Sequence, residues 1–118
     1  YVMADGSGLS RNNLFSPHQF VVVLSYMYKN PLYRPEYMAS LGVGGVDGTT
    51  EKRFKGQRLF MRVRAKTGHL TGVNALSGYI VSQSGKMLAF SFIFNDFQCY
   101  HSTVEWLQEL ILHELAKY

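Results

Sequence analysis

The residues best suited to chemistry are the tripeptide Lys66-Thr67-Gly68, at the end of a strand predicted over Arg58–Lys66. A lysine ammonium and a threonine hydroxyl at a strand end can together hold a carboxylate. The glycine that follows them lets another backbone approach closely. Taken alone, the tripeptide is more typical of a lysine that caps a strand before a tight turn. It indicates a carboxylate site only if other motifs accompany it.

Other reactive residues favour no second site. The four histidines lack the spacing of metal ligands, so neither a metal nor another cofactor is expected. Cys99 and His101 are close in sequence, but this proximity does not set the geometry of a nucleophile and its base. Arg62 and Arg64 share one predicted strand face, either as a cationic strip for an anionic substrate or as an ordinary solvated face.

The composition is that of a globular chain. Of its 118 residues, 47% are hydrophobic and 17% are charged, which suits one core. The net charge of +4 is spread along the chain without a nucleic-acid motif, so no nucleic-acid partner is expected. Cys99 is the only cysteine, so an intrachain disulfide is impossible. The longest apolar stretch, 87–94, is too short to cross a bilayer, and no transmembrane segment is expected.

Capping signals predict the first helix. Ser16 is its N-cap, Pro17 its first residue, and Gln19 completes a capping box, while Lys29 ends it before Pro31. The region 30–56 is predicted to be largely irregular. It contains a short helix over Pro35–Leu41 and one further turn over Thr50–Phe54.

Three strands and a last helix follow. Arg58–Lys66 alternates, with Leu59, Met61, Val63 and Ala65 on one face, and Val73–Ser82 and Lys86–Asn95 form a hairpin. The strand Lys86–Asn95 is apolar on both faces and should be buried on both. Ser102 and Glu105 predict a capping box for a helix whose buried stripe is Val104, Leu107, Leu110, Ile111 and Leu115. The fold class is α+β, with three antiparallel strands flanked by helices.

The motifs occur in an order that is more specific than any one of them. D-G-S-G-L-S-R lies at residues 5–11, G-V-D-G-T at 45–49 and K-T-G at 66–68, followed by Gly72-Val73 and Ser77-Gly78-Tyr79. K-T-G is one of the motifs of penicillin-binding proteins. The chain resembles the serine peptidases of family S13, the D-alanyl-D-alanine carboxypeptidases of the penicillin-binding protein 4 type. The resemblance implies that residues 1–118 are the C-terminal portion of a penicillin-binding, transpeptidase-like domain.

The resemblance also implies an activity and its partners. A serine outside these residues would attack the D-alanyl-D-alanine bond of a peptidoglycan stem peptide and form an acyl-enzyme. β-Lactams would acylate the same serine. Such enzymes are exported or periplasmic. The alternatives are a non-catalytic module that binds peptidoglycan peptides, and a hydrolase of β-lactams or esters.

Site residues follow from the matched motifs. By resemblance, Lys66 supplies positive charge and handles protons, Thr67 binds the terminal carboxylate, and the backbone N–H after Gly68, that of His69, is one oxyanion donor. The side chain of the stem peptide would lie in a pocket to which four residues contribute: Gly8, Leu9, Arg11 and Thr71.

The sequence departs from the family pattern in two respects. No S-x-x-K occurs in residues 1–118, and the S-x-N match at Ser10-Arg11-Asn12 falls inside the first motif. His69 stands where a small or hydroxylated residue is more common. The family's sheet also has N-terminal strands, so Lys86–Asn95 should present an open edge to the missing N-terminal part of the protein or to a second chain.

Overall fold

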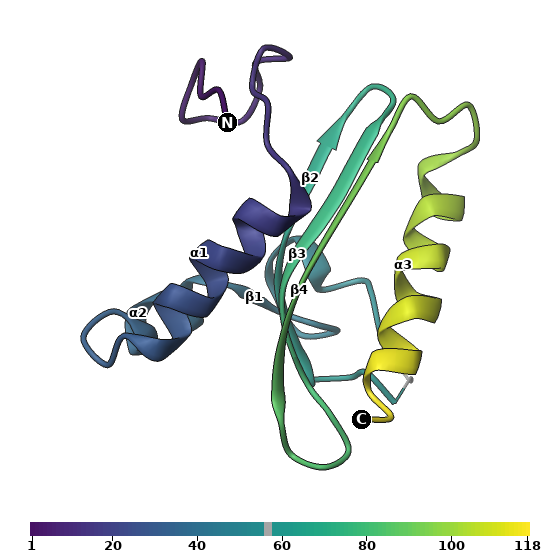
Figure 1. The fold of residues 1–118 in the computed structure, drawn as a ribbon. Helices are drawn as coiled ribbons and strands as arrows, with labels where there is room; N and C mark the ends of the chain where they lie inside the picture. The colour runs from purple at the N-terminus through teal and green to yellow at the C-terminus, as the bar shows by residue number, and fades with distance from the viewer. Residues whose placement is uncertain (56–57) are drawn as a thin grey trace.

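The computed structural model describes residues 1–55 and 58–118. It contains one antiparallel sheet in the order β1-β2-β3-β4, covered by α1 and α2 on one face and by α3 on the other (Figure 1). The elements are α1 Pro17–Lys29, α2 Arg34–Ser40, β1 Gly42–Val43, the 3₁₀ turn η1 Gly48–Thr50, β2 Val63–Leu70, β3 Val73–Val81, β4 Met87–Asn95 and α3 His101–Leu115. The predicted α+β class is confirmed, with a fourth, two-residue strand that was not predicted.

The first helix begins and ends as predicted. The Ser16 hydroxyl accepts from the backbone N–H of Gln19, and the Gln19 side chain accepts from the backbone N–H of Ser16, which completes the capping box. The short second helix lies within one residue of its predicted range at each end. The predicted turn that begins at Thr50 is present, since the backbone N–H of Arg53 donates to the carbonyl oxygen of Thr50 at 3.0 Å, and it follows a 3₁₀ turn over Gly48–Thr50 that was not predicted.

The start of the strand that contains Lys66-Thr67-Gly68 was predicted wrongly. β2 begins at Val63 rather than Arg58, because Met61 adopts a left-handed φ of 59° and is 62% exposed. Leu59 is fully buried, but from a turn that precedes the strand. β2 then continues to Leu70, so Lys66-Thr67-Gly68 lies within the strand and not at its end.

Close packing of β2 on β3 depends on a glycine. Gly78 faces Ala65 across the pair, and a Cβ added at Gly78 would lie 2.1 Å from the carbonyl oxygen of Arg64. Only glycine therefore allows the two backbones to approach this closely. The register continues to Leu70↔Val73, where the hairpin turns.

β4 is an edge strand in the part of the chain that is described, with β3 as its one neighbour. The predicted open edge is confirmed there, although what covers it stays a prediction. The prediction that both faces of β4 are buried was wrong: only Phe90 is buried, and its neighbours in the strand are mostly half-buried. An apolar strand with one partner keeps part of its surface accessible.

Each face of the sheet has its own core. On the α3 face, Leu76, Ile80 and Phe90 pack with Leu112 of the helix. On the α1 face, Leu24 and Leu41 pack with Tyr79.

The C-terminal helix was predicted with the wrong cap, and its buried stripe was predicted only in part: Val104 is buried and Leu115 packs on the core. Its N-cap is Tyr100, without a side-chain hydrogen bond, so the predicted Ser102–Glu105 capping box is absent. The buried positions are Val104, Gln108 and Leu112, while Leu107 and Leu110 are 40% and 42% exposed. A buried glutamine in the stripe rotates the buried face away from the position that hydrophobicity alone indicates. No helix in residues 1–55 and 58–118 has the length and apolarity needed to cross a membrane.

A buried tyrosine joins the sheet to α1. The Tyr79 hydroxyl donates to the carbonyl oxygen of Leu24 at 2.7 Å, and the residue is 1% exposed. Burial, followed by the nearby Tyr37 and Tyr28, raises the pKa of Tyr79 from 10.0 to about 12. The fold therefore favours the neutral phenol.

Replacing Tyr79 with phenylalanine tests this contact. We expect Tyr79→Phe to lower the free energy of unfolding by about 1 kcal/mol at neutral pH, measured by urea denaturation of the protein that carries this chain. Because the folded pKa is raised, the contribution of Tyr79 is present below pH 10.0 and is lost as pH rises toward about 12. The difference in free energy of unfolding between the wild type and Tyr79→Phe should therefore become smaller over that pH range. Tyr118→Phe, at a tyrosine that is 75% exposed, is the matched control.

Candidate carboxylate-binding strand and its pockets

The K-T-G residues alternate between the two faces of β2. Arg64 donates to the carbonyl oxygen of Met38 in α2, so Lys66 and Gly68, at the same parity, lie on the α1 face. Ala65 belongs to the α3-side core, which places Thr67 on that side. Lys66 is exposed and Thr67 is half-buried, so neither is a core residue.

The outer edge of β2 is open beside these residues. β1 pairs only with Arg64 and Ala65, and in the described chain nothing pairs with Lys66–Leu70 on that side. The carbonyl of Val63 accepts from Gly44 of the β1 side, whereas that of Arg62 accepts from Val81 of the β3 side. Since hydrogen-bonding direction alternates along a strand, the N–H and C=O groups of residues 67 and 69 point to the open edge. The N–H of His69, the expected oxyanion donor, therefore points to the open edge.

A groove of about 310 Å³ runs along this site on the α1 face. Lys66, Thr67 and Gly68 line it from β2, and Ser77 lines it from β3. The Lys66 ammonium donates to the carbonyl oxygen of Thr67 at 2.7 Å. The predicted position of Lys66 and Thr67 beside a groove is thus confirmed, and the Lys66 ammonium lies against the Thr67 backbone.

The N-terminal motif forms a loop around one carboxylate. Asp5 accepts from the backbone N–H groups of Gly8 and Ser10, both at 3.1 Å, and from the side chains of Ser7 at 2.9 Å and Asn13 at 2.7 Å. The hydrogen bonds from Asn13 and Ser7 are the largest causes that lower the pKa of Asp5 below 3.8. The D-G-S-G-L-S-R pattern therefore encodes a turn around Asp5, which Asn13 also supports from outside the motif.

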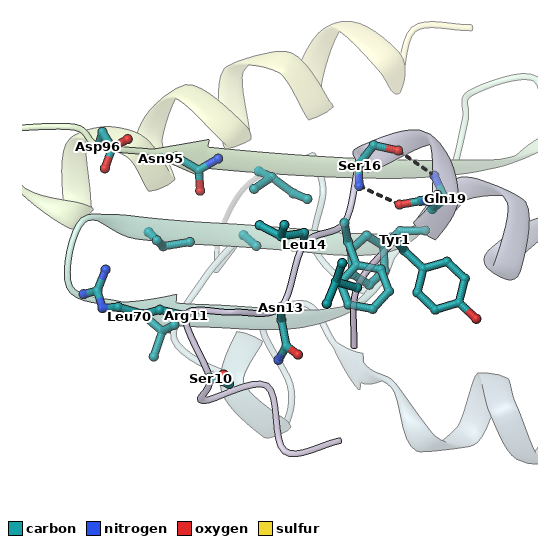
Figure 2. Close-up of a pocket in the computed structure, with 16 residues that line it drawn as sticks. Tyr1, Ser10, Arg11, Asn13, Leu14, Ser16, Gln19, Leu70, Asn95 and Asp96 are labelled. Atoms are coloured by element: carbon teal, nitrogen blue, oxygen red, sulfur yellow. Dashed lines mark hydrogen bonds between the residues drawn. The ribbon is translucent and has the colours of Figure 1, made fainter. Parts of the chain in front are cut away.

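Arg11 connects this loop to the sheet. Its guanidinium donates to the carbonyl oxygen of Thr71 at 2.8 Å, at the β2–β3 turn. Arg11 also lines a larger hollow of about 810 Å³, with Phe15, Leu70 and Asn95 (Figure 2). The structure thus brings Arg11 and Thr71 together, while Gly8 and Leu9 are exposed and lie outside the lining of this hollow.

The two hollows adjoin each other. Both are lined by Phe20 of α1, Ala75 of β3 and Ile93 of β4, so they form one depression across the α1 face of the sheet. In residues 1–55 and 58–118, no group of three or more histidine, cysteine, aspartate or glutamate side chains is arranged to hold a metal ion.

Sequence reasoning missed the partner of His69. Its ring stacks on that of His101, with centroids 3.6 Å apart and planes inclined by 18°. It also missed the buried pair of Asn74 and Gln108, whose side chains hydrogen-bond at 2.8 Å. Neither contact leaves a local signal, because the partners are more than 30 residues apart.

Comparison with known proteins identifies the class. The model of the D-Ala-D-Ala carboxypeptidase 3 (S13) family matches residues 1–108, and the chain belongs to this family.

Individual relatives agree with this assignment. The chain is 42% identical over 84 residues to penicillin-sensitive carboxypeptidase A of Dictyostelium discoideum, covering 69% of this chain and 16% of that protein. It is 41% identical over 91 residues to D-alanyl-D-alanine carboxypeptidase DacB of Haemophilus influenzae, covering 75% and 19%. The crystal structure of penicillin binding protein 4 (dacB) from H. influenzae superposes with a TM-score of 0.91 at 33% identity, over 99% of this chain and 28% of that one. The same protein has been solved in complex with a β-lactam. The chain thus spans about a fifth of the length of these curated relatives.

Removing the Asp5 carboxylate should loosen the N-terminal loop. We expect Asp5→Asn to speed hydrogen exchange in peptides that cover residues 5–13, because an amide replaces a charged acceptor of four hydrogen bonds. The depressed pKa means that the wild-type protection is present above pH 3.8 and is lost as pH falls below it. Glu51→Gln, an exposed carboxylate outside the loop, is the control. Equal exchange in Asp5→Asn and wild type would contradict the proposed role of this carboxylate.

Proposed function

We propose that the protein that carries this chain is a serine-type D-alanyl-D-alanine carboxypeptidase or endopeptidase, and that residues 1–118 are the C-terminal portion of its penicillin-binding domain. The observation that carries the proposal is the open edge of β2 beside Lys66 and Thr67, on a fold shared with penicillin binding protein 4. The substrate would be a peptidoglycan stem peptide, and β-lactams would bind at the same place. Such an enzyme works outside the cytoplasm, so export is part of the proposal.

The stem peptide would lie antiparallel or parallel to β2 as an added strand. The outward N–H and C=O groups of Thr67 and His69 supply the main-chain hydrogen bonds of this pairing. Side-chain recognition falls to Arg11 and Thr71 at the hairpin end of the strand, and to Gly8 and Leu9 in the loop that Arg11 connects to it. Of these, Arg11 and Thr71 are already in contact.

The groups that act on the scissile bond come partly from this chain and partly from the rest of the protein. A serine hydroxyl from outside residues 1–118 adds to the penultimate D-alanine carbonyl, and its proton leaves through a neighbouring base. The N–H of His69 donates to the oxyanion that forms. The C–N bond then breaks, the terminal D-alanine leaves with a proton, and water hydrolyses the acyl-serine ester.

Lys66 and Thr67 act on the terminal carboxylate. The Thr67 hydroxyl donates to it, while the Lys66 ammonium provides a favourable potential and assists proton transfer. The same pair would hold the carboxylate of a β-lactam, whose ring carbonyl takes the place of the scissile amide.

Thr67→Val tests the carboxylate contact. In the full-length protein we expect acylation by a fluorescent penicillin to slow by about tenfold to a hundredfold, since a hydrogen bond to a charged group contributes roughly 1.5–3 kcal/mol. The fold should be preserved because valine has the shape of threonine. Thr67→Ser keeps the hydroxyl and should retain most of the rate, and Thr103→Val on exposed α3 surface is the matched control. An unchanged acylation rate in Thr67→Val would remove Thr67 from the site.

Residues 1–118 alone should not be acylated. They contain no S-x-x-K, so the activated serine that attacks a penicillin is missing from them. The measurement is incubation of this segment and of the full-length protein with fluorescent penicillin, followed by mass spectrometry. Covalent label on a serine of the isolated segment would contradict the proposed division of the site.

A further inference from the structure

A chain of polar side chains runs under the hairpin end of β2 and β3, from Arg53 to His101. Arg53 donates to the Gln108 side-chain oxygen at 3.1 Å, and the Gln108 amide nitrogen donates to the Asn74 side-chain oxygen at 2.8 Å. The Asn74 amide nitrogen lies 3.2 Å from Nδ1 of His101. Gln108 and Asn74 are 0% and 3% exposed, so their polar atoms depend on these partners.

The chemistry of the groups fixes the direction of every hydrogen bond in this chain. A guanidinium only donates, so Gln108 must present its oxygen to Arg53 and its NH₂ to Asn74. Asn74 must then present its oxygen to Gln108 and its NH₂ to His101. His101 is left with one role at Nδ1, that of acceptor, which places its ring proton on Nε2.

Arg53 is itself held in place. Its Nε is 3.0 Å from a carboxylate oxygen of Glu109, and another of its nitrogens donates to the carbonyl oxygen of Glu105 at 3.1 Å. The Arg53 side chain is only 10% exposed. The direction of the chain is therefore set at its start by a group that cannot reverse.

At the other end, His101 is packed against the active-site strand. Its ring stacks on His69 at 3.6 Å and meets Phe97 edge-on at 4.9 Å. His69 faces Asn74 across the β2–β3 pair, so the same asparagine adjoins both imidazoles. His69 itself is exposed at the open edge of the sheet.

We propose that His101 is a positioning residue for the active-site strand: the Arg53–Gln108–Asn74 chain holds its Nε2–H tautomer and its orientation, and its ring in turn holds His69. This inference rests on the proposed function, in which the outward N–H of His69 donates to the oxyanion. The stack restrains the end of a strand edge that has no partner in the described chain. A small displacement of an oxyanion donor lowers the rate of the chemical step more than the affinity for the ground state.

The tautomer is tested by nitrogen-15 NMR of histidine-labelled full-length protein. His101 is assigned from the signal that is lost in His101→Phe. In the wild type, Nδ1 of His101 should show the shift of an unprotonated nitrogen. Asn74→Asp replaces the NH₂ donor by a second acceptor of the same shape, so Nδ1 should become protonated. Gln98→Glu makes the same charge change at an exposed site before α3 and should leave the signal unchanged. A protonated Nδ1 in the wild type would overturn the inferred direction of the chain.

Positioning is tested by the kinetics of acylation with a fluorescent penicillin. We expect His101→Ala to lower the acylation rate constant by about tenfold, with the dissociation constant of the preceding complex changed less than about twofold. His101→Phe keeps a ring to stack on His69 and should recover most of the rate, whereas His101→Asn keeps an acceptor without the ring and should not. His18→Ala, in the exposed first turn of α1, is the control.

The outcomes separate the two proposals. A wild-type protein that is not acylated refutes the proposed function, and the tautomer is then judged by NMR alone. An acylated wild type with unchanged kinetics in folded His101→Ala refutes the positioning role. Equal losses of acylation rate in His101→Phe and His101→Asn would also refute it, because the rate would then not depend on an aromatic ring stacked on His69.

Discussion

The pairing of β1 with β2 stops after two residues, and the proposed site depends on this interruption. The chain turns away at the glycines that follow β1, where Gly45 has a φ of 81° and the Asp47 carboxylate accepts the N–H of Val43. The edge of β2 is thereby left open from Lys66 to Leu70. An unpaired strand edge exposes donors and acceptors that bind an extended peptide readily. Here that edge lies beside an ammonium and a hydroxyl, which suit the terminal carboxylate of a peptide.

An open edge is useful only if the strand itself is rigid, and both faces of the sheet contribute to that. On the α1 face, Tyr79 is buried and hydrogen-bonded to the backbone of α1. On the α3 face, Leu76 and Leu112 are fully buried. Gly78 permits the close backbone approach that seats β2 on β3. A strand held from both faces and along one edge can present its other edge with little reorganisation, which favours catalysis by preorganised donors.

Family membership and the shape of this chain are consistent with a divided active site. The chain matches about a fifth of the curated relatives' length, yet superposes closely on the corresponding part of penicillin binding protein 4. The depression on the α1 face joins the Lys66 groove to the hollow beside Arg11. In the proposed enzyme, this chain would supply the carboxylate and oxyanion contacts, while the nucleophile would come from the remaining polypeptide. His69 and His101 add a side-chain support for that strand edge that is visible only in three dimensions.

The sequence alone determined those elements that depend on residues close together in the chain. The Ser16–Gln19 capping box acts over a few residues, and the ordered motifs identified the family and the K-T-G strand. The start of β2, the buried face of α3 and the His69–His101 stack depended on partners distant in sequence. Met61 breaks the alternation through a left-handed backbone, and Gln108 occupies a core position because Arg53 and Asn74 satisfy its amide. Hydrophobic periodicity predicts neither the left-handed backbone of Met61 nor the burial of Gln108. A buried polar group such as the Gln108 amide is stabilised by partners that only the tertiary structure brings to it.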